Sequence, residues 1–454
     1  MKLRLTFAAS LLVLALPYRA HAQQTVQPWL ADRRYGEGIG IRTGNLELHP
    51  GVAAEVGYDS NYFLRAPNEP VGNEPVRSAF RLRVTPSLSL ATLGPERRQG
   101  VTPSGPPVFT FRSGVFVSYN EFFGSDEVRK QRNADVGANM KLDLFPKSRV
   151  GVDTYADYLR IVQPSNDGDT ENAFNRDSLR VGAGITWRPG GGLFSWRAGY
   201  ELGYNYFEDT NFRLYDNYQH TISLKGRWRF LPRTSFLYEG QYTWVQYASS
   251  AEANGNLMRS RIGVNGLVTN HFGFLGMVGW GASFYNANGP IPAQQFDSIT
   301  GQAEVRWFIT PQQSADATGV MGLSSIALGY TRDFANSYLG DFYQRDRGYM
   351  DFSYMLGGLA VIDLQGGVSN LAFPATSFPN GAGQRNAAFS EQRVDAQLFG
   401  EYRFSDEWGV NTTIRYDQNF SDTLLNLVPN AGPTEKDDLR FARWQAFLGV
   451  RWFM

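Results

Sequence analysis

Apolar and polar residues alternate along most of this chain, from Leu46 to the last residue. A period of two is typical of a β-strand with one apolar face, and residues 80–90 show it clearly. One face carries Phe80, Leu82, Val84, Pro86, Leu88 and Leu90, and the other carries Arg81, Arg83, Thr85, Ser87 and Ser89. Residues 179–188 and 408–417 repeat the pattern. We count about eighteen such segments, each long enough to cross a bilayer at a tilt.

The connections between these segments alternate in length. Short ones lie at 145–148, 189–192, 231–233 and 405–407, and longer polar ones at 163–175, 370–390 and 419–437. Short periplasmic turns and long outer loops are typical of outer-membrane barrels. Residues 93–106 and 310–322 are longer than this rule predicts for the short side. The pattern predicts an all-β fold, a transmembrane antiparallel up-and-down β-barrel with both termini in the periplasm.

The tryptophans support the same orientation. The nine that follow Trp29 all fall on the face assigned outward: Trp187, Trp196, Trp228, Trp244, Trp280, Trp307, Trp408, Trp444 and Trp452. Six of the nine also lie beside a short turn or the C-terminus, where aromatic girdles meet the membrane interface. The final segment, 444–454, carries an unbroken outward row and resembles the C-terminal signal read by the barrel-insertion machinery. That signal usually ends in an aromatic residue, whereas this chain ends in Met454 with Phe453 beside it.

The N-terminus resembles a secretory signal peptide. Lys2 and Arg4 precede a short apolar stretch at 5–16, and Ala20-His21-Ala22 matches the small-x-small pattern before a cleavage site. We therefore expect a signal peptide at 1–22, a periplasmic lead-in at 23–45 and the barrel at 46–454, in the bacterial outer membrane. Composition narrows the function. The 43 basic and 43 acidic residues argue against a nucleic-acid partner, and the absence of cysteine excludes thiol chemistry.

The inward face carries the candidate functional residues. Near the periplasmic end it collects ten bases: Lys141, Arg149, Arg188, Arg197, Lys225, Arg227, Arg229, Arg306, Arg403 and Arg451. One interpretation is a ring that focuses positive potential on an anionic solute. The other is that these charges pair across neighbouring strands, as Arg149 could with Asp143.

Several aromatic residues also face inward, namely Phe116, Tyr155, Tyr285, Tyr349, Phe399 and Phe447. Their rings could stack on the apolar faces of sugars and form a carbohydrate path. Alternatively, they pack against a plug or an inward-folded loop. The pattern leaves both interpretations open.

Catalytic and cofactor motifs are weak, and the sequence predicts neither an enzyme nor a cofactor or metal site. The four histidines are scattered, and no Ser-His-Asp set can be assembled. The glycines at 36–40 are not preceded by a strand or followed by a helical pattern, so a nucleotide loop is disfavoured. The acidic segment 167–171 could bind Ca²⁺, although a solvated loop is the simpler interpretation.

The start of the barrel carries a family resemblance. Residues 45–52 (Asn-Leu-Glu-Leu-His-Pro-Gly-Val) lead into 56–63 (Val-Gly-Tyr-Asp-Ser-Asn-Tyr-Phe). This passage resembles outer-membrane β-barrel porins associated with capsule and exopolysaccharide export, of the myxobacterial type. The resemblance implies a conduit for a polysaccharide cargo that works with a periplasmic polysaccharide export protein and an inner-membrane polymerisation complex. It assigns no functional residue.

With this resemblance, the sequence predicts an outer-membrane channel that exports a capsule- or exopolysaccharide-type polymer. The alternative is a general or substrate-selective diffusion porin for small solutes, and an outer-membrane enzyme is the least favoured function. Without the resemblance, the residues alone predict a wide polar pore, because about eighteen strands enclose more space than side chains alone can fill.

Overall fold

The computed structural model describes residue 29 and residues 40–67, 75–93, 107–162, 175–250, 252–286, 293–313, 320–322, 324–337, 341–357, 359–377, 384–421, 423–425 and 437–454. The predicted signal peptide at 1–22, the glycines at 36 and 38, and the acidic segment 167–171 lie outside these residues.

Eighteen long strands form the wall, and each follows from an alternating segment of the sequence. They are β2 (Leu46–Asp59), β3 (Ala79–Thr92), β4 (Phe109–Gly124), β5 (Asn133–Leu144), β6 (Val150–Ile161), β7 (Arg176–Trp187), β8 (Phe194–Phe207), β9 (Asn217–Leu231), β10 (Thr234–Tyr247), β11 (Gly255–Leu267), β12 (Phe272–Tyr285), β13 (Asp297–Phe308), β16 (Ser325–Asn336), β17 (Phe342–Leu356), β18 (Ala360–Phe373), β21 (Phe389–Arg403), β22 (Trp408–Phe420) and β25 (Phe441–Phe453).

Shorter elements lie at the two ends of the wall. They are β1 (Ile41–Thr43), α2 (Asp126–Arg129), the 3-10 turns η3 (Pro189–Gly192) and η4 (Thr210–Tyr215), and the hairpins β14 (Pro311–Gln313) with β15 (Val320–Gly322), β19 (Thr376–Ser377) with β20 (Gln384–Asn386), and β23 (Leu424–Leu425) with β24 (Asp437–Asp438). The short strand β1 pairs with β2 and comes from the predicted lead-in, where the sequence indicated no strand.

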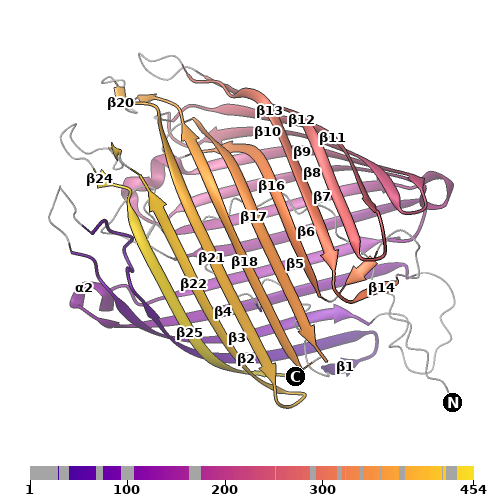
Figure 1. Cartoon of the computed structure of the whole chain (residues 1–454), viewed down its shortest axis with the longest axis horizontal. Coiled ribbons are helices and arrows are strands. Elements are labelled where there is room, and N and C mark those ends of the chain that lie inside the picture. The colour runs from indigo at the N-terminus through magenta and orange to yellow at the C-terminus, as the bar shows by residue number, and fades with distance from the viewer. Residues whose placement is uncertain are drawn as a thin grey trace.

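The wall closes on itself. Each long strand pairs antiparallel with the next in chain order, and β2 completes the circle by pairing with β25 from Gly51↔Phe453 to Asp59↔Gln445. In Figure 1 the magenta strands form the far side and the orange and yellow strands the near side, with the C-terminus and β1 at the same end. This closed antiparallel 18-strand barrel confirms the predicted fold.

The two faces of the wall differ as the alternation predicted. Apolar side chains cover the outer face, where Phe80 is 62% exposed and Ile299 64% exposed. Seven of the nine tryptophans on this face are among the exposed large side chains, and Trp244 and Trp452 are half-buried. The inner face holds charged and polar residues, with Glu55, Arg83 and Glu401 all buried. An apolar exterior around a polar interior is what lipid requires of a spanning barrel.

The connections also follow the expected asymmetry. The turn at 232–233 between β9 and β10 lies at the end with the C-terminus, whereas the last residue of β2 and the first residue of β3 lie at the opposite, outer end. On the periplasmic side, β3 ends at Thr92 and β4 begins at Phe109, and the hairpin β14–β15 lies between β13 and β16. No helix among the described residues is long and apolar enough to cross a membrane.

Candidate functional site: an arginine-lined recess in the barrel lumen

The bases predicted from the sequence do not act as one uniform ring. Five of them contact a carboxylate: Lys141 with Asp143 at 3.3 Å, Arg197 with Asp153 at 2.5 Å, Arg306 with Glu304 at 2.9 Å, and both Arg403 and Arg451 with Glu401 at 3.0 and 2.7 Å. Asp143 therefore pairs with Lys141 and not with Arg149. The pairing interpretation describes these five residues better than a free positive ring.

The other five bases are more open. Arg149 and Arg227 are exposed, Lys225 and Arg229 are half-buried, and Arg188 donates to the backbone carbonyl of Ser148 at 3.3 Å. Arg149 directly precedes β6 and Arg188 directly follows β7, whereas Lys225, Arg227 and Arg229 lie on β9.

The inward aromatic residues lie against the wall. Five face a glycine directly across the strand pair: Phe447 and Gly57, Phe116 and Gly137, Tyr155 and Gly182, Tyr285 and Gly255, and Tyr349 and Gly329. A Cβ at any of these glycines would come within 2.1 to 2.4 Å of the ring. The glycines therefore make room for rings that lie flat on the neighbouring strand. For these five residues, stacking on sugars and packing against an inward-folded segment both stay predictions.

The sixth inward aromatic, Phe399, packs against a residue from the lead-in. Trp29 is 6% exposed and forms an apolar cluster with Phe399, Val361 and Ala53 on the inner wall. The Arg451 guanidinium lies 4.9 Å from the centre of the Trp29 ring, a cation–π distance. This indole occupies the periplasmic third of the lumen, and sequence periodicity gave no signal for it because it lies outside the strands.

A second occupied region lies at the outer end, where the chain after β2 folds inward. Residues 61–66 are all buried. Asn61 holds this loop by donating to the Arg65 carbonyl at 2.8 Å and to the Ala442 carbonyl at 3.3 Å. Arg65 binds Glu127 of α2. The loop thus bridges β25 and α2 and places Tyr62 beside the inner wall.

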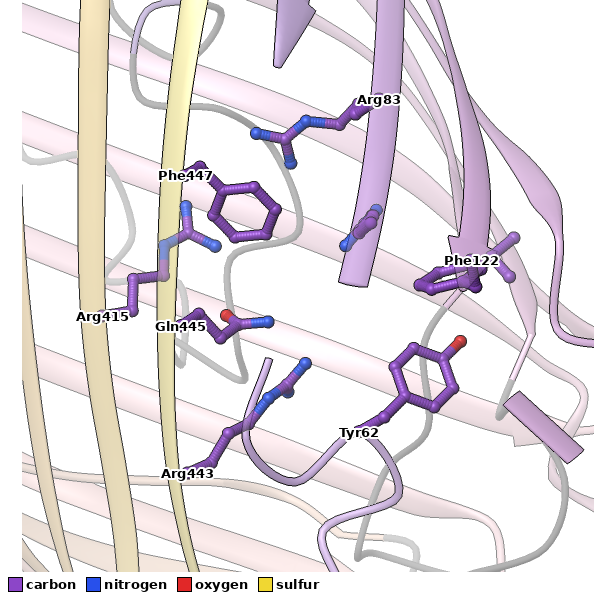
Figure 2. A pocket seen from close by; sticks show the side chains of 9 residues that line it. Tyr62, Arg83, Phe122, Arg415, Arg443, Gln445 and Phe447 are labelled. Atoms are coloured by element: carbon purple, nitrogen blue, oxygen red, sulfur yellow. The ribbon is translucent and has the colours of Figure 1, made fainter. Parts of the chain in front are cut away.

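A small recess lies between this loop and the wall. Figure 2 shows seven of its side chains around a common space. The lining residues come from both ends of the chain: Tyr62, Arg81, Arg83, Phe122, Val162, Arg415, Arg443, Gln445 and Phe447. Four are arginines and none is acidic, so the recess presents cationic groups and hydrogen-bond donors.

The carboxylates that balance these arginines bind them from the wall. Arg83 donates through Nε to Glu55 at 2.8 Å, and Arg443 donates through Nε to the two oxygens of Asp59 at 3.0 and 3.1 Å. Both pairs are buried. A buried arginine needs such a partner, because an unpaired charge inside a protein costs several kcal/mol.

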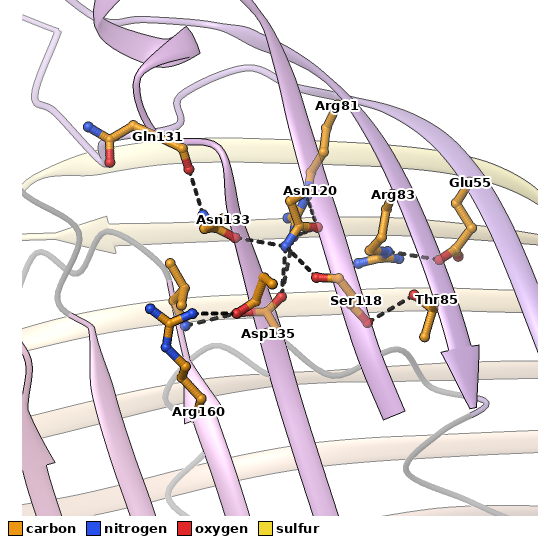
Figure 3. Close-up of polar contacts among 12 residues, drawn as sticks. Glu55, Arg81, Arg83, Thr85, Ser118, Asn120, Gln131, Asn133, Asp135 and Arg160 are labelled. Atoms are coloured by element: carbon orange, nitrogen blue, oxygen red, sulfur yellow. Dashed lines mark hydrogen bonds and ion pairs between the residues drawn. The ribbon is translucent and has the colours of Figure 1, made fainter. Parts of the chain in front are cut away.

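A polar network continues from the recess across β3, β4 and β5. Arg81 donates to Asn120 Oδ1 through Nε at 2.9 Å and Nη2 at 2.5 Å, and Asn120 donates to Asp135 at 3.0 Å. In Figure 3 this chain of bonds runs beside a hydroxyl pair, Thr85 and Ser118, whose oxygens lie 2.9 Å apart. The network holds the Arg81 guanidinium in one orientation.

Two loop groups have shifted pKa values. Burial raises the pKa of the Tyr62 hydroxyl, so this group remains a neutral donor. The hydrogen bond from Arg65 lowers the pKa of Glu127 below its usual range, which keeps that carboxylate ionised and the loop anchored. No group of three or more His, Asp or Glu residues within the described ranges is arranged to hold a metal ion.

Sequence reasoning placed Arg81 and Arg83 on the polar face of their strand but did not single them out. Arg415 also fell on an inward face, Tyr62 appeared only within the passage that carries the family resemblance, and Arg443 was not considered. The available signal was the inward register of the arginines near the outer ends of β3, β22 and β25. Their convergence depends on barrel closure, which no local pattern reports.

No family model matches the chain, and no curated protein matches it. Among solved structures it is similar to OpdK of Pseudomonas aeruginosa with vanillate (11% identity, 90% of this chain and 99% of that chain covered, TM-score 0.45). It is also similar to the FrpB iron transporter of Neisseria meningitidis (8%, 91% and 82%, 0.46) and to OccK5 of Pseudomonas aeruginosa (8%, 91% and 100%, 0.45). With its closed sheet, apolar exterior and charged interior, the chain is an outer-membrane β-barrel.

Proposed function

We propose that this protein is a passive channel through which small solutes diffuse across the outer membrane. The observation that carries the proposal is the inner face, which bears charged residues on strands around the barrel while the outer face is apolar. Pairs such as Arg197 with Asp153 and Arg306 with Glu304 belong to separate parts of the wall, on β6 and β8 and on β13. Hydrated charges lining a barrel of this strand number favour passage of water and small polar molecules.

Two occupied regions favour small solutes over a polymer. Trp29 lies in the periplasmic third of the lumen, and the loop carrying Tyr62 lies in the outer third. Phe399 has no exposed surface, and Tyr285 and Tyr349 are each less than a tenth exposed. A polysaccharide path would need accessible ring faces to stack on sugars. Polysaccharide export, which the resemblance implies, therefore has less support than diffusion.

Reconstitution in planar lipid bilayers tests the proposal. We expect steady unitary currents in KCl from the folded full-length protein, with folding checked by its heat-dependent migration on gels. A folded protein that conducts no current contradicts diffusion. A strain that lacks the gene supplies the second measurement. We expect normal surface polysaccharide, whereas loss of surface polymer with continued synthesis would favour export.

A further inference from the structure

The recess beside Tyr62 has donor groups that have no partner among the described residues. Among the contacts of the described residues, Arg83 has a bond only through Nε, so both of its Nη groups have no hydrogen-bond partner. Arg443 engages Asp59 through Nε and Nη2, and Arg81 engages Asn120 through Nε and Nη2. Among the described residues, their Nη1 groups have no hydrogen-bond partner. Four guanidinium nitrogens, from Arg81 and Arg83 of β3 and Arg443 of β25, therefore have unused donors near this recess.

Tyr62 gives a second and independent observation. Its side chain is 2% exposed, and its hydroxyl has no hydrogen-bond partner within the part of the chain that the structure describes. A buried polar group without a partner is costly and uncommon in native proteins. Tyr62 belongs to the lining of the same recess as the three arginines. An acceptor inside the recess would satisfy the phenol and the guanidiniums together.

The acidic residues around the recess set the chemical class of that acceptor. Glu55 and Asp59 bind Arg83 and Arg443 from the wall, and Asp135 lies 3.7 Å from Arg81. Asp417 is an electrostatic neighbour of both Arg415 and Arg443. None of these four carboxylates is among the residues that line the space. A ligand in the recess therefore meets N–H and O–H donors. The carboxylates behind these donors offset the positive charge of the four arginines when no ligand is bound.

We propose that this recess is a binding site for a small multivalent oxyanion, one that carries carboxylate or phosphate groups, on its way through the lumen. The assignment rests on the proposed diffusion function and names its preferred solute class. The planar guanidinium fork matches two oxygens of a carboxylate or phosphate at once, which a halide cannot reproduce. Because the recess is partly desolvated, each such bond is stronger than it would be in bulk water.

The experiment uses the full-length protein with two probes, citrate and inorganic phosphate, against a chloride background. In planar bilayers we expect either or both probes to interrupt the KCl current at concentrations where added chloride has no effect. Calorimetric titration of the folded protein in detergent measures binding without any need for conduction. Citrate and phosphate are compared separately, because their relative affinities distinguish a carboxylate ligand from a phosphate ligand.

Two variants make the test specific to the recess. Tyr62→Phe removes only the unpartnered hydroxyl, so folding is preserved, and we expect a several-fold weaker affinity for the probe. The double substitution Arg83→Gln with Glu55→Gln removes the cation and its buried partner together, and we expect a loss of about tenfold or more. The matched control is Tyr119→Phe on β4, an exposed tyrosine of the outer face, which should leave affinity unchanged.

The outcomes separate this inference from the proposed function. A conducting protein that neither citrate nor phosphate binds or blocks overturns the oxyanion site and leaves diffusion intact. Binding that survives both recess variants also overturns it. A silent protein that binds a probe, and loses affinity with Tyr62→Phe, supports the site and contradicts diffusion.

Discussion

The inward rings show how single residues shape this wall. Tyr155 lies across Gly182 and donates its hydroxyl to Glu201 of β8, so one side chain ties three neighbouring strands together. The ring replaces the side chain that the glycine lacks and covers backbone that would otherwise face water. Aromatic cover over a strand glycine is a known device for holding register. The inward aromatic residues therefore act first in the packing of the wall, and only secondarily in any contact with a solute.

Replacing Gly182 with alanine tests this arrangement. The new Cβ would lie 2.4 Å from Cζ of Tyr155, so the ring must leave its place and lose its bond to Glu201. We expect a loss of about 1–3 kcal/mol in the free energy of unfolding, measured by urea titration in lipid vesicles. Gly276→Ala is the matched control, because a Cβ there meets nothing within 4 Å. Equal free energies of unfolding for the two variants would show that the Tyr155 ring does not stabilise the wall.

Among the elements, the lead-in departs most from the sequence-based expectation. It contributes the short strand β1 and places Trp29 inside the barrel on Phe399 and Val361. Among the described residues, the buried indole nitrogen has no hydrogen-bond partner, so Trp29 is held by apolar contact and by the Arg451 guanidinium. Trp29, from a segment expected only to connect the signal peptide to the barrel, therefore occupies part of the periplasmic lumen.

The substitution Trp29→Ala measures how far this residue narrows the channel. Truncation of a buried tryptophan to alanine removes roughly 3–5 kcal/mol of packing energy. The side chain then no longer packs against the wall or fills this part of the lumen. We expect a larger unitary conductance in planar bilayers. Trp187→Ala is the control, since that indole is 53% exposed on the outer face and should leave conductance unchanged. If both variants conduct like the native protein, Trp29 does not constrict the path.

For the whole molecule, closure is the decisive event. The seam between β2 and β25 joins residues almost four hundred positions apart, and Asp59 accepts hydrogen bonds there from Arg443 and from Gln445 at 2.7 Å. His49 and Met454 meet at the periplasmic end of the seam, with 2.9 Å between Nδ1 and the backbone oxygen. The same closure brings the arginines of β3 and β25 to one recess, so barrel assembly and the candidate binding site depend on one set of contacts.

Asp59→Asn tests the seam. The substitution leaves the Arg443 charge buried without its carboxylate, and we expect a loss of about 3–5 kcal/mol in the free energy of unfolding. Urea unfolding in vesicles, followed by tryptophan fluorescence, gives the value. Asp143→Asn is the comparison, because the Lys141 pair is a fifth to a quarter exposed and should contribute at most about 1 kcal/mol. A loss no greater than that of the comparison variant would mean that hydrogen bonds of the backbone alone hold the seam.

Much of this architecture could be predicted because its signals are local. Strand alternation, the length of connections and the outward tryptophans depend on neighbours in the chain, so the sequence by itself determined the strands, their faces and the barrel class. Even the periplasmic exceptions at 93–106 and 310–322 were visible as lengths. The direction of Arg81 and Arg83 was likewise determined, because side chains of a strand must alternate.

Tertiary structure decided what those inward residues contact. Which carboxylate meets Lys141, which glycine lies under Tyr155 and where Trp29 rests depend on strand register and on segments that fold inward. The recess is the clearest case, since Tyr62 and Arg443 come from opposite ends of the chain and meet only when β2 pairs with β25. Periodicity specifies a face, whereas contact requires three-dimensional proximity, and that is set by closure of the barrel.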